Sequence, residues 1–340
     1  MKKATITDVA RQAGVSIKTV SRVINREPNV RESTRARVAK AIEKLRYRPS
    51  TSARSLAGSK SFLLALLYDN PSSSYVTNVQ NGLLEVCQQN QYDLLIHPCD
   101  YQEPSLTDEI AELVRNTRVD GLVLTPPVTD RQSVQQLLRK IGIPHVLISP
   151  RDCDDHDMTV CTNDREASSE MVQYLASLGH DRIAFIQGHP DHEAIGNRFD
   201  GYRDGLTVSG LPFRKSLCVQ GFNSFESGVE QGRRLLSRKS PPTAIFASND
   251  DMAAGVVRAA HEAGFSVPRD VSVAGFDDIP LARYVWPALT TIRQEIRAMG
   301  HRSAELLLRR INAQDTDDLA RIIDSELVIR DSTGPARNAA

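Results

Sequence analysis

Apolar and polar positions change their spacing once along the chain, near residue 60. Before that point apolar side chains recur every three or four residues, as in Val20, Val23 and Ile24, which is the spacing of one face of an α-helix. From Ser61 onward, short and almost continuous apolar runs alternate with amphipathic segments. The pattern predicts a small all-α unit followed by a larger body of strands and helices.

The first 25 residues predict two short helices joined by a tight turn. Thr7 and Ser16 each offer a side-chain oxygen where a helix is expected to begin, and such an oxygen accepts a hydrogen bond from an amide that lacks a partner inside the helix. Gly14 permits the sharp reversal that ends the first helix near Ala13. A third helix closes the unit near Tyr47, and its inner face carries Val38, Ile42 and Leu45.

The second helix has one apolar face that packs and one polar face that is free to bind. A helix of this size fits the major groove of DNA, where Arg22 can donate two hydrogen bonds to a guanine edge and Lys18 can reach a guanine or a phosphate. The alternative is a small helical hairpin with a basic, solvated face. The predicted DNA-contacting residues of this unit are Thr5, Ser16, Ile17, Lys18, Ser21, Arg22 and Asn25. Among them Ser16, Ser21 and Asn25 suit phosphate oxygens, which set the register of binding.

The charge of the chain is divided between its two parts. The formal net charge is zero, but residues 1–60 contain 15 Lys or Arg against 4 Asp or Glu, whereas the remainder contains 27 against 38. A cationic head suits a polyanion, and an acidic body avoids non-specific binding to the same polyanion. The distribution therefore favours DNA as the partner of the first 60 residues.

The order Asp-Val-Ala-x-x-Ala-Gly-Val-Ser-x-x-Thr-Val-Ser-Arg-Val-Ile-Asn runs from Asp8 to Asn25. It closely resembles the helix-turn-helix of the lactose/galactose repressor (LacI/GalR) family. The resemblance implies a sequence-specific transcriptional regulator, expected to be a repressor of carbohydrate-utilisation genes, which binds double-stranded operator DNA. This family usually has a small polar residue where this chain has Arg31, so either the cap of the third helix shifts to Ser33 or Arg31 meets a phosphate.

Residues Ser50–Gly58 form a short linker with weak helical character, too short to be a stable helix in water. Their Ala-Arg-Ser-Leu-Ala sequence resembles the hinge of the same family, in which segments from two subunits become helical only in the minor groove. The resemblance implies that Leu56 is an apolar wedge between base pairs and that Ala53 packs beside it. Because the polar tail 331–340 lacks leucine heptads, we expect a homodimer rather than a larger assembly.

Several short apolar runs after Ser61 are predicted to be strands. They are Phe62–Leu67, Asp93–His97, Gly121–Leu124, His145–Ser149, Arg182–Ile186, Leu217–Gln220, Ala244–Ala247, Val271–Gly275 and, near the end, Glu326–Arg330. The helices between and after them include Val76–Asn90, Arg165–Leu178, Asp250–Ala263 and a helix that follows Leu289–Gln294 and continues through Arg310. Apolar strands that alternate with helices favour parallel sheets covered on both faces.

This pattern resembles the two-lobed, periplasmic-binding-protein-like core of the same family. We therefore predict an α/β fold whose two lobes are parallel sheets with flanking helices, preceded by an all-α helix-turn-helix domain. The expected boundaries are 1–48 for the DNA-binding domain, 49–60 for the hinge, 61–330 for the effector-binding and dimerisation core, and 331–340 for a polar tail.

Ligands of such folds bind beyond the carboxyl ends of the strands, here in the cleft between lobes. Polar and aromatic residues just past predicted strand ends are therefore candidates for binding an effector. They are Asp69, Ser72, Ser73, Ser74, Tyr75, Ser149, Arg151, His189 and His192.

Three further candidates come from the resemblance. Arg198 matches the Arg-x-x-Gly-Tyr motif, Asn249 opens Asn-Asp-Asp-Met-Ala-Ala-Gly, and Asp277 is the first Asp of Gly-Phe-Asp-Asp. A carboxylate, an amide and a guanidinium can each hold two adjacent hydroxyls, so they suit a sugar. The alternative is that Asn249 and Asp277 only cap loops and helices.

Two aromatic positions depart from the family pattern. Asn223 stands where the family often has an aromatic that closes over the ligand; either Phe222 or Phe225 replaces that aromatic, or stacking is absent. The loop with Trp286, the only tryptophan, lies near the subunit interface in the family. We therefore favour interface or core packing for Trp286 over stacking on a sugar.

The remaining signals mostly exclude functions. The five cysteines are scattered and lack a Cys-x-x-Cys pair, so we expect reduced, mostly buried thiols. The spacing of His189 and His192, and the acidic run Asp152–Asp157, do not fit a metal site. Phosphate-binding, dinucleotide-binding and nucleophile-elbow motifs are missing from the sequence. We therefore expect no cofactor and no enzymatic activity.

Without an apolar leader or spanning segment, a cytoplasmic protein that joins the nucleoid at its operator is expected.

Overall fold

The structure of the protein is a computed structural model that describes residues 4–24, 30–45, 47, 60–151, 153, 158–192 and 194–337. Contacts divide the chain into two units, residues 1–62 and 63–340, and each is described by itself. The predicted hinge residues Ala53 and Leu56, and the DNA-contact candidate Asn25, lie outside the described residues.

The first unit contains three helices around a small apolar core. They are α1 (Ile6–Ala13), α2 (Ile17–Ile24) and α3 (Glu32–Leu45). Val9, Val20 and Val38, one from each helix, are fully buried, and Tyr47 packs on the same cluster. The predicted helices and the inner face of the third helix are confirmed.

The cap of α1 differs from the prediction. The Oγ1 of Thr5 accepts a hydrogen bond from the amide of Asp8 at 3.3 Å, and Oδ2 of Asp8 accepts one from the amide of Thr5 at 3.0 Å. This reciprocal pair satisfies two amides at once, so Thr5 caps the helix and the prediction for Thr7 was wrong. Ser16 does cap α2, since its Oγ accepts from the amide of Thr19 at 3.1 Å. Gly14 adopts the predicted left-handed conformation, with φ of 62°.

The start of α3 lies at Glu32, directly after Arg31. The carbonyl oxygen of Arg31 accepts hydrogen bonds from the amides of Thr34 and Arg35 at 2.9 and 3.0 Å. Arg31 therefore occupies the cap position itself, and the alternative in which the cap shifts to Ser33 was wrong.

The second unit consists of two lobes, each built on a six-stranded sheet. The sheet of the first lobe has the order β11-β5-β4-β3-β1-β2, and all its pairs are parallel. Its strands are β1 (Leu63–Tyr68), β2 (Asp93–Pro98), β3 (Gly121–Leu124), β4 (His145–Ile148), β5 (Thr159–Thr162) and β11 (Ile322–Ile323).

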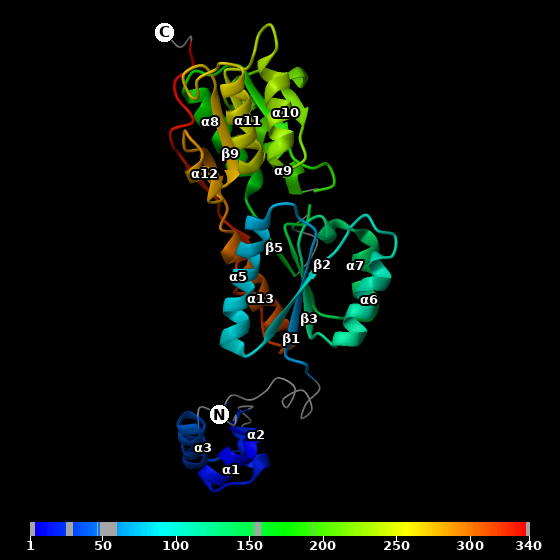
Figure 1. Ribbon diagram of the computed structural model, residues 1–340. Helices are drawn as coiled ribbons and strands as arrows, with labels where there is room; N and C mark the ends of the chain where they lie inside the picture. The colour runs from blue at the N-terminus through cyan, green and yellow to red at the C-terminus, as the bar shows by residue number, and fades with distance from the viewer. Residues whose placement is uncertain are drawn as a thin grey trace. The chain divides into compact units, whose positions relative to one another are not determined.

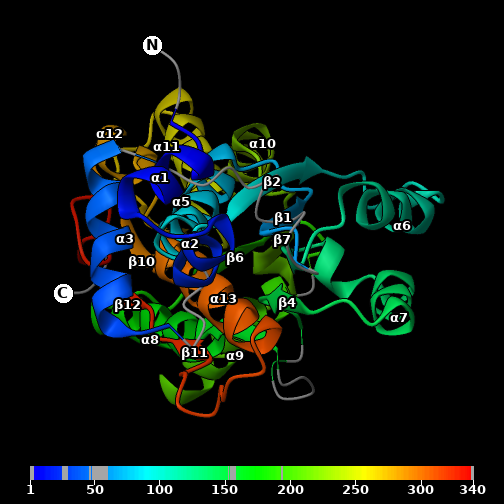
Figure 2. The same ribbon diagram turned by 90° about the horizontal axis from the view of Figure 1, so that it is seen from below.

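Helices cover both faces of the first sheet, as parallel strands require. α5 (Ser73–Asn90) and α13 (Ile296–Ile311) pack together on one face, while α6 (Leu106–Thr117) and α7 (Gln132–Ile141) lie on the other (Figures 1 and 2). The short helix η1 (Val128–Asp130) precedes α7. The α5 and α13 backbones approach closely because Gly82 and Gly300 lie at their crossing.

The sheet of the second lobe has the order β12-β10-β9-β8-β6-β7, in which β12 alone is antiparallel. Its strands are β6 (Ile183–Gln187), β7 (Cys218–Gln220), β8 (Ala244–Ala247), β9 (Ser272–Asp277), β10 (Thr290–Arg293) and β12 (Glu326–Val328). Its helices are α8 (Asp164–Ser177), α9 (Ala194–Val208), η2 (Lys215–Leu217), α10 (Phe225–Leu236), α11 (Asp250–Glu262) and α12 (Leu281–Tyr284). α8 pairs with α9 and α10 pairs with α11, and each pair covers an apolar core (Figure 1).

The predicted strands are all present, with ends shifted by up to two residues. Three strands were missed, namely β5, β10 and β11. β5 reads Thr-Val-Cys-Thr and β10 reads Thr-Thr-Ile-Arg, and these four-residue segments lack the continuous apolar run used to find the others. Both are largely buried because each lies inside a sheet.

The chain passes between the lobes three times. It crosses from β5 to α8 over Thr162–Asp164, from β10 to α13 at Gln294–Glu295, and from β11 to β12 at Asp324–Ser325. The crossovers are hydrogen-bonded to one another: Asn163 Oδ1 accepts from the amide of Ser325 at 2.7 Å, and Nε2 of Gln294 donates to Asp164 Oδ1 at 2.8 Å. Movement of one crossover therefore disturbs the others.

Cys153 and Cys161 form a disulfide, with their Cα atoms 6.4 Å apart. The expectation that all five thiols are reduced was wrong. The connection between β4 and β5 brings Cys153 beside β5, which the spacing of the two residues in the sequence did not reveal. Cys87, Cys99 and Cys218 are free, and Cys87 is buried.

None of the helices in the described part of the chain has the length and apolarity needed to cross a membrane.

Candidate functional site

The exposed face of α2 is the first candidate surface. Ile17 is 48% exposed, and Lys18 and Arg22 are also exposed, whereas Val20 on the opposite face is buried. Ser21 is half-buried, and the Oγ of Ser16 is used as the helix cap and also lies 2.9 Å from Oγ1 of Thr19. The helix thus presents an apolar tip and two cations to the exterior, as the sequence predicted.

The second candidate site is a small polar cavity between the two lobes of the second unit, with a volume of about 60 Å³. Both lobes and two of the three crossovers contribute to its walls. Its lining consists of Asn70, Ser72, Tyr75, Pro126, Ser149, Asp164, His192, Ile195, Arg198, Asn223, Asn249, Asp277 and Gln294. These residues follow the carboxyl ends of strands in both sheets, where ligands of parallel α/β folds bind.

Arg198 of α9 is the central cation of the cavity. Its Nε donates to Oδ2 of Asp164 at 2.8 Å, and its Nη1 donates to the carbonyl oxygen of Ser248. Its guanidinium carbon lies 3.8 Å from the ring centroid of Phe276, which adds a cation–π contact. Burial acts to lower the pKa of Arg198, but the carboxylates of Asp164 and Asp277 outweigh burial and raise it. The guanidinium is therefore fixed and charged.

Asp277, at the end of β9, faces this guanidinium without being fully satisfied by it. Its Oδ1 lies 3.4 Å from Nη1 of Arg198 and is buried, yet it has no hydrogen-bond partner among the described residues. Burial raises the pKa of Asp277 to about 7, against the attraction of Arg198. A buried acceptor without a donor is costly, so Asp277 is suited to accept a hydrogen bond from a ligand.

Asn249 has both roles that the sequence left open. Its Oδ1 caps α11 by accepting from the amide of Met252 at 3.0 Å, and its Nδ2 donates to the carbonyl oxygen of Asn223 at 3.0 Å. It lines the cavity as well. Its two hydrogen bonds hold the N-terminus of α11 against the loop that contains Asn223. Asn249 therefore helps to shape the wall of the cavity.

His192 is a neutral member of the cavity wall. Burial is the main cause that lowers its pKa to about 4, and the charges of the nearby His189 and Arg198 contribute to the same shift. At neutral pH its imidazole can therefore donate one hydrogen bond and accept another, which suits a hydroxyl group.

Three lining residues that are not glycine adopt left-handed backbone conformations. The φ angles are 45° for Ser149, 59° for Asn223 and 108° for Asp277. Such residues are uncommon and each costs conformational energy, which persists where the surrounding structure enforces it. Their concentration around one cavity indicates a functional site.

Comparisons with known proteins match both parts of the chain. Residues 5–50 match the family of bacterial regulatory proteins, lacI family, and residues 172–333 match the periplasmic binding protein-like domain. Catabolite control protein A of Priestia megaterium is 33% identical over 335 residues, which cover 97% of this chain and 99% of that protein. The chain belongs to the LacI family.

Two solved structures extend the likeness to three dimensions. The lac repressor dimer bound to operator and the anti-inducer ONPF has a TM-score of 0.78 and 27% identity, over 98% of this chain and 100% of that chain. The complex of the transcriptional regulator CelR with cellobiose has a TM-score of 0.74 and 27% identity, over 97% of this chain and 99% of that chain. This LacI-family protein is a DNA-binding transcriptional regulator with a two-lobed core.

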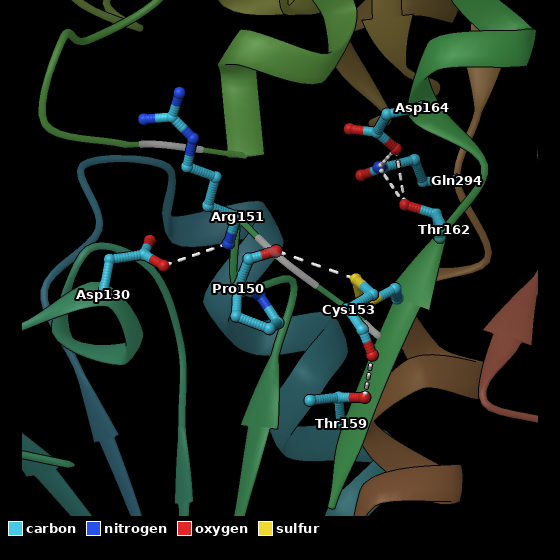
Figure 3. The surroundings of a disulfide bond; sticks show 9 residues. Asp130, Pro150, Arg151, Cys153, Thr159, Thr162, Asp164 and Gln294 are labelled. Atoms are coloured by element: carbon cyan, nitrogen blue, oxygen red, sulfur yellow. Dashed lines mark hydrogen bonds between the residues drawn. A yellow bond between two sulfur atoms is a disulfide. The ribbon is translucent and has the colours of Figure 1, made fainter. Parts of the chain in front are cut away.

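The structure brings most of the predicted effector residues together. Ser72, Tyr75, Ser149, His192, Arg198, Asn223, Asn249 and Asp277 all line the cavity. Five others lie outside its lining. Oδ2 of Asp69 accepts from the amide of Tyr101, Ser73 is exposed at the start of α5, and Arg151 is exposed. Ser74 and His189 are not lining residues either. Figure 3 shows the guanidinium of Arg151 turned away from Cys153 and Asp164.

Five lining residues were not predicted, and they are Asn70, Pro126, Asp164, Ile195 and Gln294. Asn70 belongs to the same loop as the predicted Asp69 and Ser72, so the sequence identified this loop but not Asn70 itself. Asp164 and Gln294 follow β5 and β10, the strands that were missed. Recognising those strands by their threonines would have identified both residues.

The structure shows where Phe222 and Phe225, the two candidates for an aromatic over the ligand, lie. Phe225 packs into the core of the second lobe, and Phe222 is 49% exposed beside His189. Neither belongs to the lining of the cavity described above. Trp286 is 79% exposed, so the alternative of core packing was wrong for it, and it is not a lining residue either.

Proposed function

We propose that this protein represses carbohydrate-utilisation genes as a homodimer on operator DNA, and that a sugar bound between the lobes controls its operator affinity. It acts by binding and does not turn the sugar over. The observation that carries the proposal is that Asp277 lines the cavity and that its buried Oδ1 has no hydrogen-bond donor among the described residues.

The chemistry of the cavity supports a polyhydroxylated ligand. Asp277 accepts a hydroxyl hydrogen, Arg198 donates to hydroxyl oxygens, and neutral His192 can do either. These groups come from different elements of the second lobe, and Tyr75 and Ser149 face them from the first. The cellobiose complex of a similar regulator is consistent with a sugar in this position.

Ligand entry requires the lobes to move. The cavity of about 60 Å³ is far smaller than the roughly 300 Å³ or more of ordinary ligand pockets. We expect the three crossovers to act as hinges, since they are the covalent links between the lobes. Asp164 joins the ligand site to the hinges, because one carboxylate oxygen accepts from Arg198 and the other from Gln294.

On the DNA side, α2 enters the major groove, where Arg22 reads a guanine and Lys18 binds a guanine or a phosphate. Residues 1–48 form this DNA-binding domain and residues 49–60 the hinge, with Leu56 as the wedge and Ala53 beside it. Residues 61–330 form the effector-binding and dimerisation core, and 331–340 a tail. The similar lac repressor is a dimer on its operator, which supports the homodimer. A regulator of this kind resides in the cytoplasm with the chromosome.

A thermal-shift screen of the full-length protein against monosaccharides and disaccharides tests the ligand site. A sugar that binds only the folded state raises the melting temperature, and Asp277→Asn should abolish that shift for the same sugar. Asp200→Asn is the matched control, since Asp200 is half-exposed on α9 and lies outside the lining. An undiminished shift in Asp277→Asn would exclude the proposed site.

A further inference from the structure

The disulfide between Cys153 and Cys161 lies beside the first crossover between the lobes. Cys161 is in β5, and Thr162 and Asp164 follow it directly (Figure 3). Thr162 Oγ1 accepts from Nε2 of Gln294 at 2.9 Å, so the strand that carries Cys161 is hydrogen-bonded to a second crossover.

The other cysteine belongs to the connection that follows the cavity wall. Cys153 comes four residues after Ser149, which lines the cavity. Its carbonyl oxygen accepts from Oγ1 of Thr159 at 3.0 Å, and the amide of Arg151 donates to Oδ1 of Asp130 at 3.0 Å. The disulfide therefore ties the segment after Ser149 to the strand that leads to Asp164.

Both oxidation states are compatible with the local structure. The Cα separation of 6.4 Å lies within the usual range for a disulfide. If the bond is reduced, the Cys153 thiol has an acceptor in place, because its Sγ lies 3.7 Å from the carbonyl oxygen of Pro150. Reduction thus leaves the Cys153 thiol with a hydrogen bond and releases the link to β5.

Small reagents can reach Cys153, which is half-buried, whereas Cys161 is only 3% exposed. Both residues line a groove of about 560 Å³, together with Thr159 and residues 317 and 319–322. For the three remaining cysteines, burial raises the pKa of Cys87 and of Cys99 to about 12 and also raises that of Cys218. A thiol held in its protonated form reacts slowly.

We propose that Cys153 and Cys161 are a reversible redox site, whose oxidation restrains the crossover at residues 162–164 and whose reduction frees it. Disulfides in proteins that work in a reducing compartment are usually transient and redox-sensing. The proposal rests on the proposed function in treating the crossovers as hinges and in placing the protein in the cytoplasm.

The chemistry needs a peroxide as the oxidant. One thiolate attacks a peroxide oxygen and becomes a sulfenic acid, with release of hydroxide that is protonated to water; the second thiolate attacks the sulfenic sulfur and expels a second hydroxide, also protonated to water. Two thiols and one hydrogen peroxide thus give one disulfide and two waters. Two equivalents of glutathione reverse the bond by thiol–disulfide exchange.

Thiol mapping of the full-length protein tests the redox site. After equilibration over a range of reduced to oxidised glutathione ratios, alkylation and mass spectrometry should show Cys153 and Cys161 becoming protected together, with a loss of two hydrogens. Cys87, Cys99 and Cys218 should stay alkylatable after denaturation. Cys153→Ser should remove the transition, and Cys218→Ser should leave it unchanged. A pair that stays reduced in the most oxidising buffer, or stays bonded in the most reducing one, would overturn the proposal.

Hydrogen exchange tests the effect on the crossover. Amides of residues 160–164 should exchange about tenfold more slowly in the oxidised protein than in the reduced one, because a disulfide opposes local opening. Equal rates in the two forms would refute the restraint. Neither measurement needs DNA or a sugar, so a failure to find an operator would leave both results interpretable.

Discussion

At the scale of single residues, Asp277 is the group whose state matters most for the ligand site. It is buried, it faces the charged Arg198, and its Oδ1 has no hydrogen-bond donor within the described ranges. Its pKa of about 7 lies well above the usual value of a carboxyl group because burial disfavours its charge. The folded protein therefore holds this proton more tightly than the unfolded chain does.

This difference predicts a dependence of stability on pH. Between the usual carboxyl pKa near 4 and about 7, the native state binds a proton that the unfolded state has released, so the free energy of unfolding falls as pH rises. Asp277→Asn should remove this contribution, which amounts to up to about 1.4 kcal/mol per pH unit. Urea unfolding of both proteins at pH 5, 6, 7 and 8 measures the difference. Parallel curves for variant and wild type would contradict the pKa assigned to Asp277.

Arg22 is the residue on which DNA specificity is expected to depend. Arg22→Ala should relax the preference at one base pair by about 1–3 kcal/mol while leaving the preference at other positions intact. Binding to a set of operator fragments with single base changes measures this. Arg11→Ala is the control for loss of charge, since Arg11 is exposed on α1. Equal weakening on every fragment would show that Arg22 binds only phosphate.

The sequence identified site residues where a strand end was recognised and failed where it was not. Tyr75, Ser149 and His192 were found from strand ends alone, and Arg198 and Asp277 from motifs. Asp164 and Gln294 were missed because the strands before them are short and rich in threonine. The hydrogen bonds that join them across the crossovers link residues about 130 positions apart, which no local pattern can show.

At the scale of elements, the packing of α5 against α13 depends on two glycines. A Cβ atom at Gly300 would overlap the carbonyl oxygen of Val79, and one at Gly82 would overlap that of Arg297. Because the obstacles are backbone atoms, the helices themselves would have to separate.

Gly300→Ala should therefore destabilise the protein by about 1–3 kcal/mol, as overpacking does. Gly196→Ala is the matched control: it is also within a helix, nothing lies within 4 Å of its added Cβ, and the substitution should be neutral or stabilise by about 0.5–1 kcal/mol. Urea unfolding checks both variants. Similar stability of the two would mean that α5 and α13 are not in close contact.

The sequence predicted helices and strands correctly wherever their apolar pattern was strong, but it placed their ends less accurately. The three helices of the first unit and the long apolar strands follow from apolar spacing. The cap of α1 was misplaced by two residues, because Thr5 and Thr7 are equally good capping residues in isolation and only the reciprocal hydrogen bonds with Asp8 distinguish them. The Cys153–Cys161 bond joins two residues whose proximity the spacing of cysteines in the sequence did not reveal.

At the scale of the whole molecule, the chain combines a basic DNA-binding unit with an acidic two-lobed receptor. The charges of residues 1–60 differ in sign from those of the rest of the chain, so DNA attracts one part and repels the other. Two of the three crossovers help to line the polar cavity. A ligand bound there can therefore act on the links between the lobes. We infer that ligand binding in this cavity changes the affinity of the protein for its operator.

The most direct test is a DNA titration of the full-length protein at fixed salt, with and without the sugar that raises its melting temperature. Fragments from the region upstream of its own gene are compared with scrambled fragments of equal length. We expect at least about 10³-fold tighter binding to one genomic fragment. The sugar should change that affinity by about fivefold or more. The Asp277→Asn variant should still bind the fragment, but the sugar should no longer change its affinity. Equal affinity for genomic and scrambled DNA, or a wild-type affinity that no bound sugar alters, would contradict the inference that ligand binding changes operator affinity.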